Sequence, residues 1–108
     1  MTMPGKIIVV TATMEFPLCP TVFVGTTDDG ATIYVRFRFG RLSIRIDHRN
    51  PAPDGGADGR RIYEEKLDPL GLDGCLEYEE LRELTGDWIE WPDELTPRKF
   101  DEDDVMEL

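Results

Sequence analysis

The stretch from Ala31 to Asp47 reads ATIYVRFRFGRLSIRID and alternates apolar and polar side chains on both sides of a single glycine. The apolar members of the alternation are Ile33, Val35, Phe37 and Phe39 before the glycine, and Leu42, Ile44 and Ile46 after it. Successive side chains of a strand point to opposite faces of a sheet, so this pattern predicts two half-buried antiparallel strands, 31–39 and 41–47. We expect Gly40 and Arg41 to form a two-residue turn between them.

The preceding segment extends this hairpin into a meander. Residues 21–27 are rich in β-formers, and Asp29-Gly30 is a preferred dipeptide for a two-residue hairpin turn. The pairs expected from the two turns are Phe39 with Leu42, Phe37 with Ile44, Val35 with Ile46, Val24 with Val35, and Val22 with Phe37. All of these apolar residues share one face, and a slip of one residue in either hairpin would destroy that agreement.

Further elements flank the meander. Residues 6–13 and 61–67 are expected strands, and residues 51–59 form a glycine- and proline-rich loop. Residues 78–85 predict a short helix with Leu81 and Leu84 facing inward, and the acidic residues 101–108 are expected to fray. The sequence therefore predicts one α+β domain over 1–108: an antiparallel β-meander of about four strands, with a short C-terminal helical segment packed on one face.

Charge divides the chain into two unequal halves. The formal net charge is −11; residues 1–50 carry six basic and four acidic side chains, whereas residues 51–108 carry six basic and 19 acidic ones. No apolar run is long enough for a membrane-spanning helix, and no secretory signal is recognisable. We therefore expect a cytoplasmic protein that does not bind membranes, in which Cys19 and Cys75 are a reduced pair rather than a disulfide.

Catalytic signatures are scarce. His48 is the single histidine and Ser43 the single serine, and neither belongs to a recognisable nucleophile or acid–base arrangement. No glycine-rich nucleotide-binding motif and no set of metal ligands can be identified. We expect no catalytic residues, no metal and no cofactor, and hence a protein that is not an enzyme.

The acidic half favours one function, that of a small interaction or inhibitor protein that binds a basic protein partner. Trp88 and Trp91 stand three residues apart, so at helical spacing both indoles would project from one face as a binding anchor, although the favoured interpretation is that one or both cover the open side of the sheet. The expected partner-binding residues are Trp88, Trp91, Glu79, Glu80, Glu83, Glu90, Asp93 and Glu94. A further alternative is a nucleic-acid mimic that blocks a DNA- or RNA-binding protein. The sequence also leaves open a homodimer formed by pairing of edge strands.

The basic face of the 31–49 hairpin supports an alternative function, the binding of an anion or of nucleic acid by Arg36, Arg38, Arg45 and Arg49. The expected register sets Arg36 opposite Arg45, and like charges opposite one another destabilise a sheet, so something should neutralise this face. The favoured neutralising groups are the chain's own carboxylates, namely Glu64, Glu65 and the acidic residues between Glu77 and Glu83. Nucleic acid is the less favoured ligand, because the chain is acidic and only Tyr34 and Phe23 would supply aromatic rings there.

Overall fold

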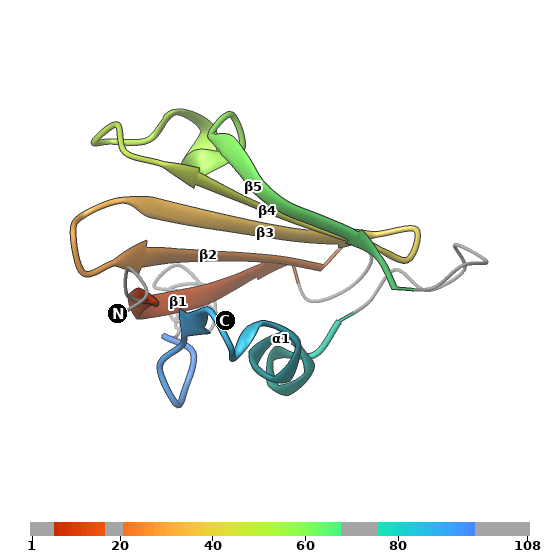
Figure 1. Ribbon diagram of the computed structural model, residues 1–108. Coiled ribbons are helices and arrows are strands. Elements are labelled where there is room, and N and C mark those ends of the chain that lie inside the picture. Colours follow the sequence, from red (N-terminus) through yellow and green to blue (C-terminus); the bar gives the residue numbers. More distant parts are fainter. Residues whose placement is uncertain (1–5, 17–20, 68–75, 97–108) are drawn as a thin grey trace, which may run out of the picture.

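The computed structural model describes residues 6–16, 21–67 and 76–96, and within them it shows a curled sheet with one short helix (Figure 1). Its elements in chain order are β1 (Ile7–Phe16), β2 (Thr21–Thr27), β3 (Thr32–Arg38), β4 (Arg41–Asp47), the 3-10 turn η1 (Pro53–Gly56), β5 (Arg60–Lys66), α1 (Tyr78–Thr85) and β6 (Ile89–Glu90). Cys19, Cys75 and the segment 101–108 lie outside the described residues.

The sheet of the described residues has six strands in the order β5-β4-β3-β2-β1-β6. Neighbouring strands are antiparallel except at one edge, where β6 runs parallel to β1. The predicted antiparallel meander is thus confirmed, but about four strands is an underestimate. The strand β6 was not predicted, because its two residues lie between Trp88 and Trp91, whose spacing suggested a helical turn.

One hydrophobic core fills the concave side of the sheet. Fully buried Phe23, Ile33, Leu42 and Ile44 from the strands meet Leu81 from the helix. A capping box between Glu77 and Glu80 closes the first turn of α1, and the buried stripe of that helix runs through Tyr78, Leu81 and Thr85. Leu84, which we expected to face inward, lies beside this stripe and is 44% exposed.

The turn between β2 and β3 is one residue longer than predicted. Asp28, Asp29 and Gly30 form it, with Gly30 at φ 90°, and the backbone N–H of Thr27 donates to the carbonyl of Ala31 at 2.9 Å. Three-residue hairpin loops of this kind commonly place glycine in the left-handed conformation. The extra residue shifts the register by one, so Phe23 rather than Val24 faces Val35 in the core. The predicted face of β2 was therefore wrong.

The turn between β3 and β4 consists of Phe39 and Gly40 rather than Gly40 and Arg41. Both residues have positive φ, 56° and 74°, which is the signature of a type I′ hairpin turn. The register is consequently shifted by two residues, and Phe37 pairs with Leu42 instead of Ile44. A shift of two keeps every strand side chain on its predicted face. Phe39 is the exception, since it leaves the strand and is 64% exposed.

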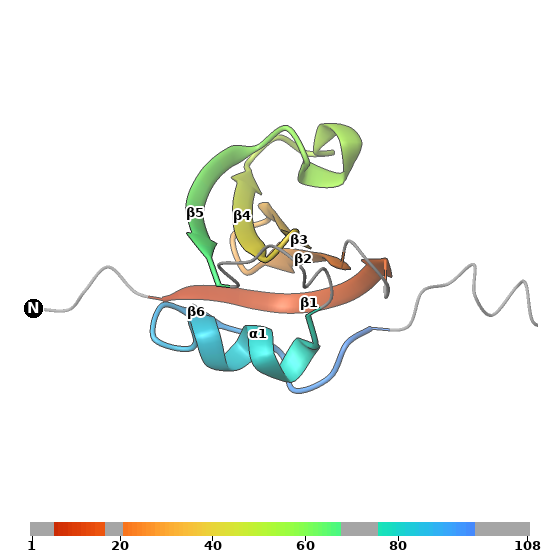
Figure 2. The same ribbon diagram turned by 90° about the vertical axis from the view of Figure 1, so that its right-hand side faces the viewer.

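The curl of the sheet brings its two edges toward each other. In Figure 2, β5 and β6 lie on the same side of the molecule, and the ring of Tyr63 on β5 packs 5.3 Å from the ring of Trp88. The turn η1 packs against β3 and β4, on the face of the sheet that is opposite to α1. The helix and η1 therefore cover different faces, and the face that carries η1 is called the outer face below.

Candidate functional site

The arginines of the hairpin lie on the outer face of the sheet because they alternate with the buried residues of β3 and β4. Their pairing differs from the prediction: Arg36 lies opposite Ser43, and Arg45 lies opposite Tyr34. Arg38 lies opposite Arg41, next to the turn. The outer face therefore carries like-charged pairs, as predicted, but Arg38 pairs with Arg41 beside the turn and Arg45 pairs with Arg61 on β5, instead of Arg36 with Arg45.

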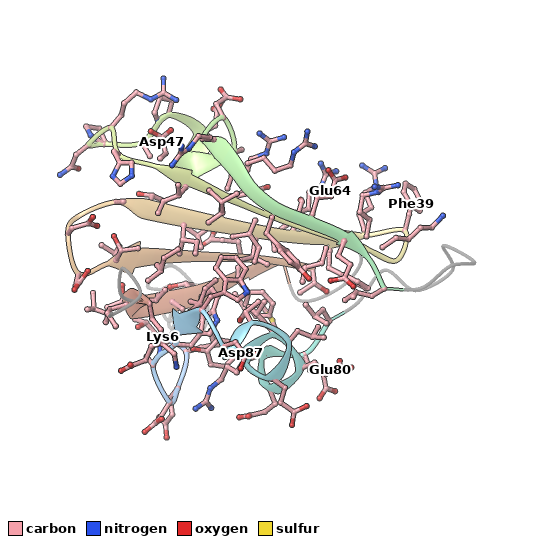
Figure 3. The ribbon with its side chains drawn as sticks, in the orientation of Figure 1. Lys6, Phe39, Asp47, Glu64, Glu80 and Asp87 are labelled. Carbon is pink, nitrogen blue, oxygen red and sulfur yellow. The ribbon has the colours of Figure 1, made fainter. Side chains whose placement is uncertain are left out.

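These side chains surround a hollow of about 310 Å³, which we call the arginine cleft. It is lined by Arg36, Arg38, Phe39, Arg41, Ser43, Arg45, Arg61 and Glu64. Figure 3 shows nitrogen-tipped side chains gathered between the labelled Phe39 and Glu64. Within the described ranges, five guanidinium groups and one carboxylate give the lining a formal charge of +4, in a chain whose net charge is −11.

Glu64 is the carboxylate that lies within the cleft. One of its oxygens lies 2.9 Å from Nη1 of Arg41 and the other 2.7 Å from Nη1 of Arg61, so a single side chain bridges both guanidiniums. Arg45 donates from Nη1 to the carbonyl of Gly59 at 3.0 Å. Within the described part of the chain, neither Arg36 nor Arg38 has a carboxylate within ion-pair distance.

Internal neutralisation of the basic face is therefore only partial. Glu64 pairs with arginines of this face, as predicted. Glu65 instead accepts a hydrogen bond from the hydroxyl of Tyr63, which is the main reason that the pKa of Tyr63 is raised to about 12. The acidic residues of α1 do not reach the arginines, because Leu81 anchors the helix in the core on the other face. That part of the prediction was wrong.

A bulge in β5 places Arg61 in the cleft. Ile44 pairs with Tyr63, but the next residue, Arg45, pairs with Arg61, so Ile62 is an extra residue in the ladder. Bulges re-aim the side chains beside them. Here the bulge sets Arg61 beside Arg45 on the outer face, while Ile62 and Tyr63 both pack against the core.

Phe39 supplies the aromatic ring of the cleft. The guanidinium carbon of Arg38 lies 4.7 Å from the centre of this ring, which is cation–π distance. Phe23, which the sequence suggested as an aromatic neighbour of the arginines, is instead fully buried in the core. The aromatic ring that lines the cleft is therefore that of Phe39 in the turn and not that of Phe23 in β2.

Arg49, the fourth predicted anion-binding residue, lies outside the cleft. Its Nε and Nη2 donate to the two carboxylate oxygens of Asp47 at 2.9 and 2.8 Å. These hydrogen bonds hold the pKa of Asp47 below its ordinary value. Because its guanidinium already has a bidentate carboxylate partner, Arg49 has less capacity for an external anion than Arg36 or Arg38.

The two tryptophans bracket β6 instead of sharing a helical face. Trp91 is 6% exposed, and its indole N–H donates at 2.7 Å to the hydroxyl of Thr85, which itself donates to the carbonyl of Leu81. Trp88 is partly buried against Tyr63. The core role was the correct alternative for Trp91, and neither indole is a free anchor.

The carboxylates predicted to bind a partner remain on the surface, at Glu79, Glu80, Glu83, Glu90, Asp93 and Glu94. A second hollow of about 300 Å³ lies among Glu79, Glu83 and Glu90. Arg82 lies in the same hollow, and its guanidinium pairs with Glu79 and Asp93, each at 3.3 Å. Arg82 therefore supplies this acidic hollow with one internal cation, much as Glu64 supplies the arginine cleft with one internal carboxylate.

Sequence reasoning found Arg36, Arg38, Arg45 and the neutralising carboxylate of Glu64, but it missed two cleft residues, Phe39 and Arg61. A signal for Phe39 was present, because glycine at the second position of a type I′ turn is as favourable as glycine at the first position of the predicted turn. Arg61 could be found only with the bulge, for which the sequence of β5 carries no clear mark.

No helix in the ranges 6–16, 21–67 and 76–96 is long and apolar enough to cross a membrane. No protein-family model, no curated protein and no solved structure matches this chain. Any functional conclusion therefore rests on the arrangement of the chain's own side chains.

Proposed function

We propose that the protein binds a phosphate-bearing ligand in the arginine cleft. The observation that supports this proposal is that, among the described residues, five guanidinium groups line one hollow with a single carboxylate among them. Guanidinium groups present pairs of N–H donors whose spacing matches two phosphate oxygens, and such charge-assisted hydrogen bonds are the strong ones.

The energetics of the cleft support an external anion. Arg38 and Arg41 are directly opposed on neighbouring strands, an arrangement that destabilises a sheet. Glu64 compensates Arg41 and Arg61, but it leaves Arg36 and Arg38 without a carboxylate among the described residues. A bound phosphate would bring negative charge to these two guanidiniums, so ligand binding should also stabilise the fold.

Binding of a basic protein partner by the acidic half is less well supported. Its carboxylates are exposed, but the two tryptophans on which that hypothesis depended are not free: Trp91 is buried in the core, and Trp88 packs against Tyr63. The arginine cleft has both the charge and the hollow that its proposed ligand requires.

The test is calorimetric titration with inorganic phosphate and pyrophosphate at low salt. Arg36→Gln and Arg38→Gln should each weaken binding by about tenfold or more, since a charged hydrogen bond contributes about 1.5–3 kcal/mol. Arg60→Gln is the matched control, because Arg60 carries the same charge on β5 but lies outside the cleft. Its affinity should change by less than about twofold. Equal losses in all three variants, or no binding by the wild type, would refute the proposal.

A further inference from the structure

Resting on the proposed phosphate site, we infer that the ligand is a single nucleotide whose base stacks on Phe39 while its phosphate contacts the arginines. The two groups that such a ligand needs, a planar ring and a set of guanidiniums, line the same hollow. Three further properties of Phe39 and its surroundings support this assignment.

The first property is exposure. Three large hydrophobic side chains are exposed among the described residues: Val10 at 50%, Leu84 at 44% and Phe39 at 64%. Phe39 is the most exposed and the single aromatic among them. An aromatic ring held in water beside cations is a poor contribution to a fold, but it provides a face on which any nucleobase can stack.

The second property is backbone conformation. Phe39 has φ 56°, a left-handed conformation that glycine, asparagine and aspartate adopt much more readily than phenylalanine. Non-glycine residues held in such conformations concentrate at ligand sites. The ring of Phe39 is also not part of the hydrophobic core that the described residues form. Its presence at this turn is therefore better explained by a ligand than by folding.

The third property is the neighbouring planar group. The guanidinium carbon of Arg38 lies over the ring of Phe39, 4.7 Å from its centre, so a cationic plane covers one face of this ring. Both kinds of plane stack with nucleobases. A nucleotide can therefore stack its base on the face of Phe39 that Arg38 does not cover and place its phosphate against Arg36 and Arg38.

Size and charge favour one nucleotide over a long strand. A hollow of 310 Å³ lies at the small end of the range of about 300–1,000 Å³ that ligand pockets occupy. The chain's net charge of −11 repels a polyanion, whereas a single nucleotide brings few charges and places them at the local cations.

The experiment compares inorganic phosphate, ribose 5-phosphate and adenosine 5′-monophosphate as ligands of the wild type and of Phe39→Leu, Phe39→Tyr and Leu84→Ala. The wild type should bind adenosine 5′-monophosphate about tenfold or more tightly than ribose 5-phosphate, which is the usual size of a base–aromatic stack. Phe39→Leu should lose this difference and keep its affinity for inorganic phosphate, which also shows that it has folded. Phe39→Tyr and the exposed control Leu84→Ala should retain the difference.

The outcomes separate the two proposals. Equal affinity of the wild type for ribose 5-phosphate and adenosine 5′-monophosphate, with inorganic phosphate still bound, overturns the nucleotide assignment and leaves the phosphate site in place. Failure of all three ligands to bind overturns the proposed function itself. A single-stranded oligonucleotide of about twelve residues that binds more than about tenfold tighter than the mononucleotide would replace one nucleotide with a strand.

Discussion

The two turns at the ends of β3 differ in how well they fit their own residues. In the first turn, Asp28–Gly30, the hydroxyl of Thr27 accepts the backbone N–H of Ala31 at 2.9 Å and donates to the carboxylate of Asp29. Gly30 adopts φ 90° without a side chain to resist it. The local donors and acceptors of this turn are paired, and each residue suits its conformation.

The second turn, Phe39–Gly40, breaks the same rules. It places phenylalanine at φ 56°, leaves the ring 64% exposed and is flanked by the opposed arginines Arg38 and Arg41. Local preferences and global structure usually agree, and the exceptions concentrate at functional sites. The comparison therefore fits the proposal: the first turn stabilises the fold, whereas the second turn would serve the proposed ligand of the arginine cleft.

The largest effect should come from the first turn. Thr27 is 3% exposed, so Thr27→Val leaves the buried N–H of Ala31 with only its longer contact, 3.4 Å to the carboxylate of Asp29, and should lower the free energy of unfolding by about 1–3 kcal/mol. Urea unfolding measures this difference. Thr26→Val, the same change at the adjacent exposed position of β2, should stay within about 0.5 kcal/mol. Equal effects of the two variants would mean that the Thr27 hydroxyl does not hold the turn.

The second turn should respond in the opposite direction. Phe39→Asn removes a left-handed phenylalanine, which costs about 1–2 kcal/mol, and forfeits a cation–π contact of about 0.5–1 kcal/mol. The variant should therefore be more stable than the wild type by about 0.5–1 kcal/mol, while binding adenosine 5′-monophosphate more weakly. Urea unfolding and calorimetry of the same preparations test both halves. A less stable Phe39→Asn protein would contradict the contrast between the turns.

The arginine pair beside the second turn should give a smaller gain. In the Phe39→Leu background, where the cation–π contact with Arg38 is already lost, Arg38→Glu converts the opposed Arg38 and Arg41 into an ion pair, which should raise the free energy of unfolding by about 0.2–1 kcal/mol and reduce phosphate affinity. The gain should disappear at about 1 M salt, where exposed charges are screened. Arg60→Glu controls for the change in net charge. A gain of the same size in that control would show that the opposed pair is not the cause.

The contrast between the turns also explains which parts of the fold the sequence predicts. Alternation alone assigns Ile33, Val35 and Phe37 of β3 to the core, and all three are buried. In β2, Val22, Phe23 and Val24 are apolar on both faces, so only the turn length sets the register, and the three-residue turn reverses the expected faces. The length of this turn depends on hydrogen bonds of Thr27 and Asp29, and the pattern of apolar residues in the sequence does not reveal them.

The candidate site divides in the same way. The positions of Arg36, Arg38 and Arg45 can be predicted from the alternation along β3 and β4. Residues that alternate with buried ones in a strand point to the opposite face of the sheet, which here is the outer face. Arg61 depends on the bulge in β5, which is a property of strand pairing. The tryptophans were misplaced because a spacing of three residues fits one helical face as well as the two ends of a short strand.

The smallest effect is the pH dependence of the first turn. The hydrogen bond from Thr27 holds the pKa of Asp29 below its ordinary value of 3.8. The folded protein therefore binds this proton less tightly than the unfolded chain, so the contribution of Asp29 to stability is complete above 3.8 and is lost as the pH falls through the folded pKa. The difference in unfolding free energy between the wild type and Asp29→Asn should thus be larger at about pH 6 than below 3.8.

The same comparison in the Thr27→Val background identifies the cause of this pH dependence. Without the Thr27 hydroxyl, the largest contribution to the lowered pKa of Asp29 is gone. The difference in unfolding free energy between Thr27→Val and the double variant that also carries Asp29→Asn should therefore vary less with pH. An unchanged pH dependence would assign the lowered pKa to the weaker hydrogen bond from the N–H of Ala31, at 3.4 Å. The first turn would then be held by its backbone, and its contrast with the second turn would rest on Gly30 alone.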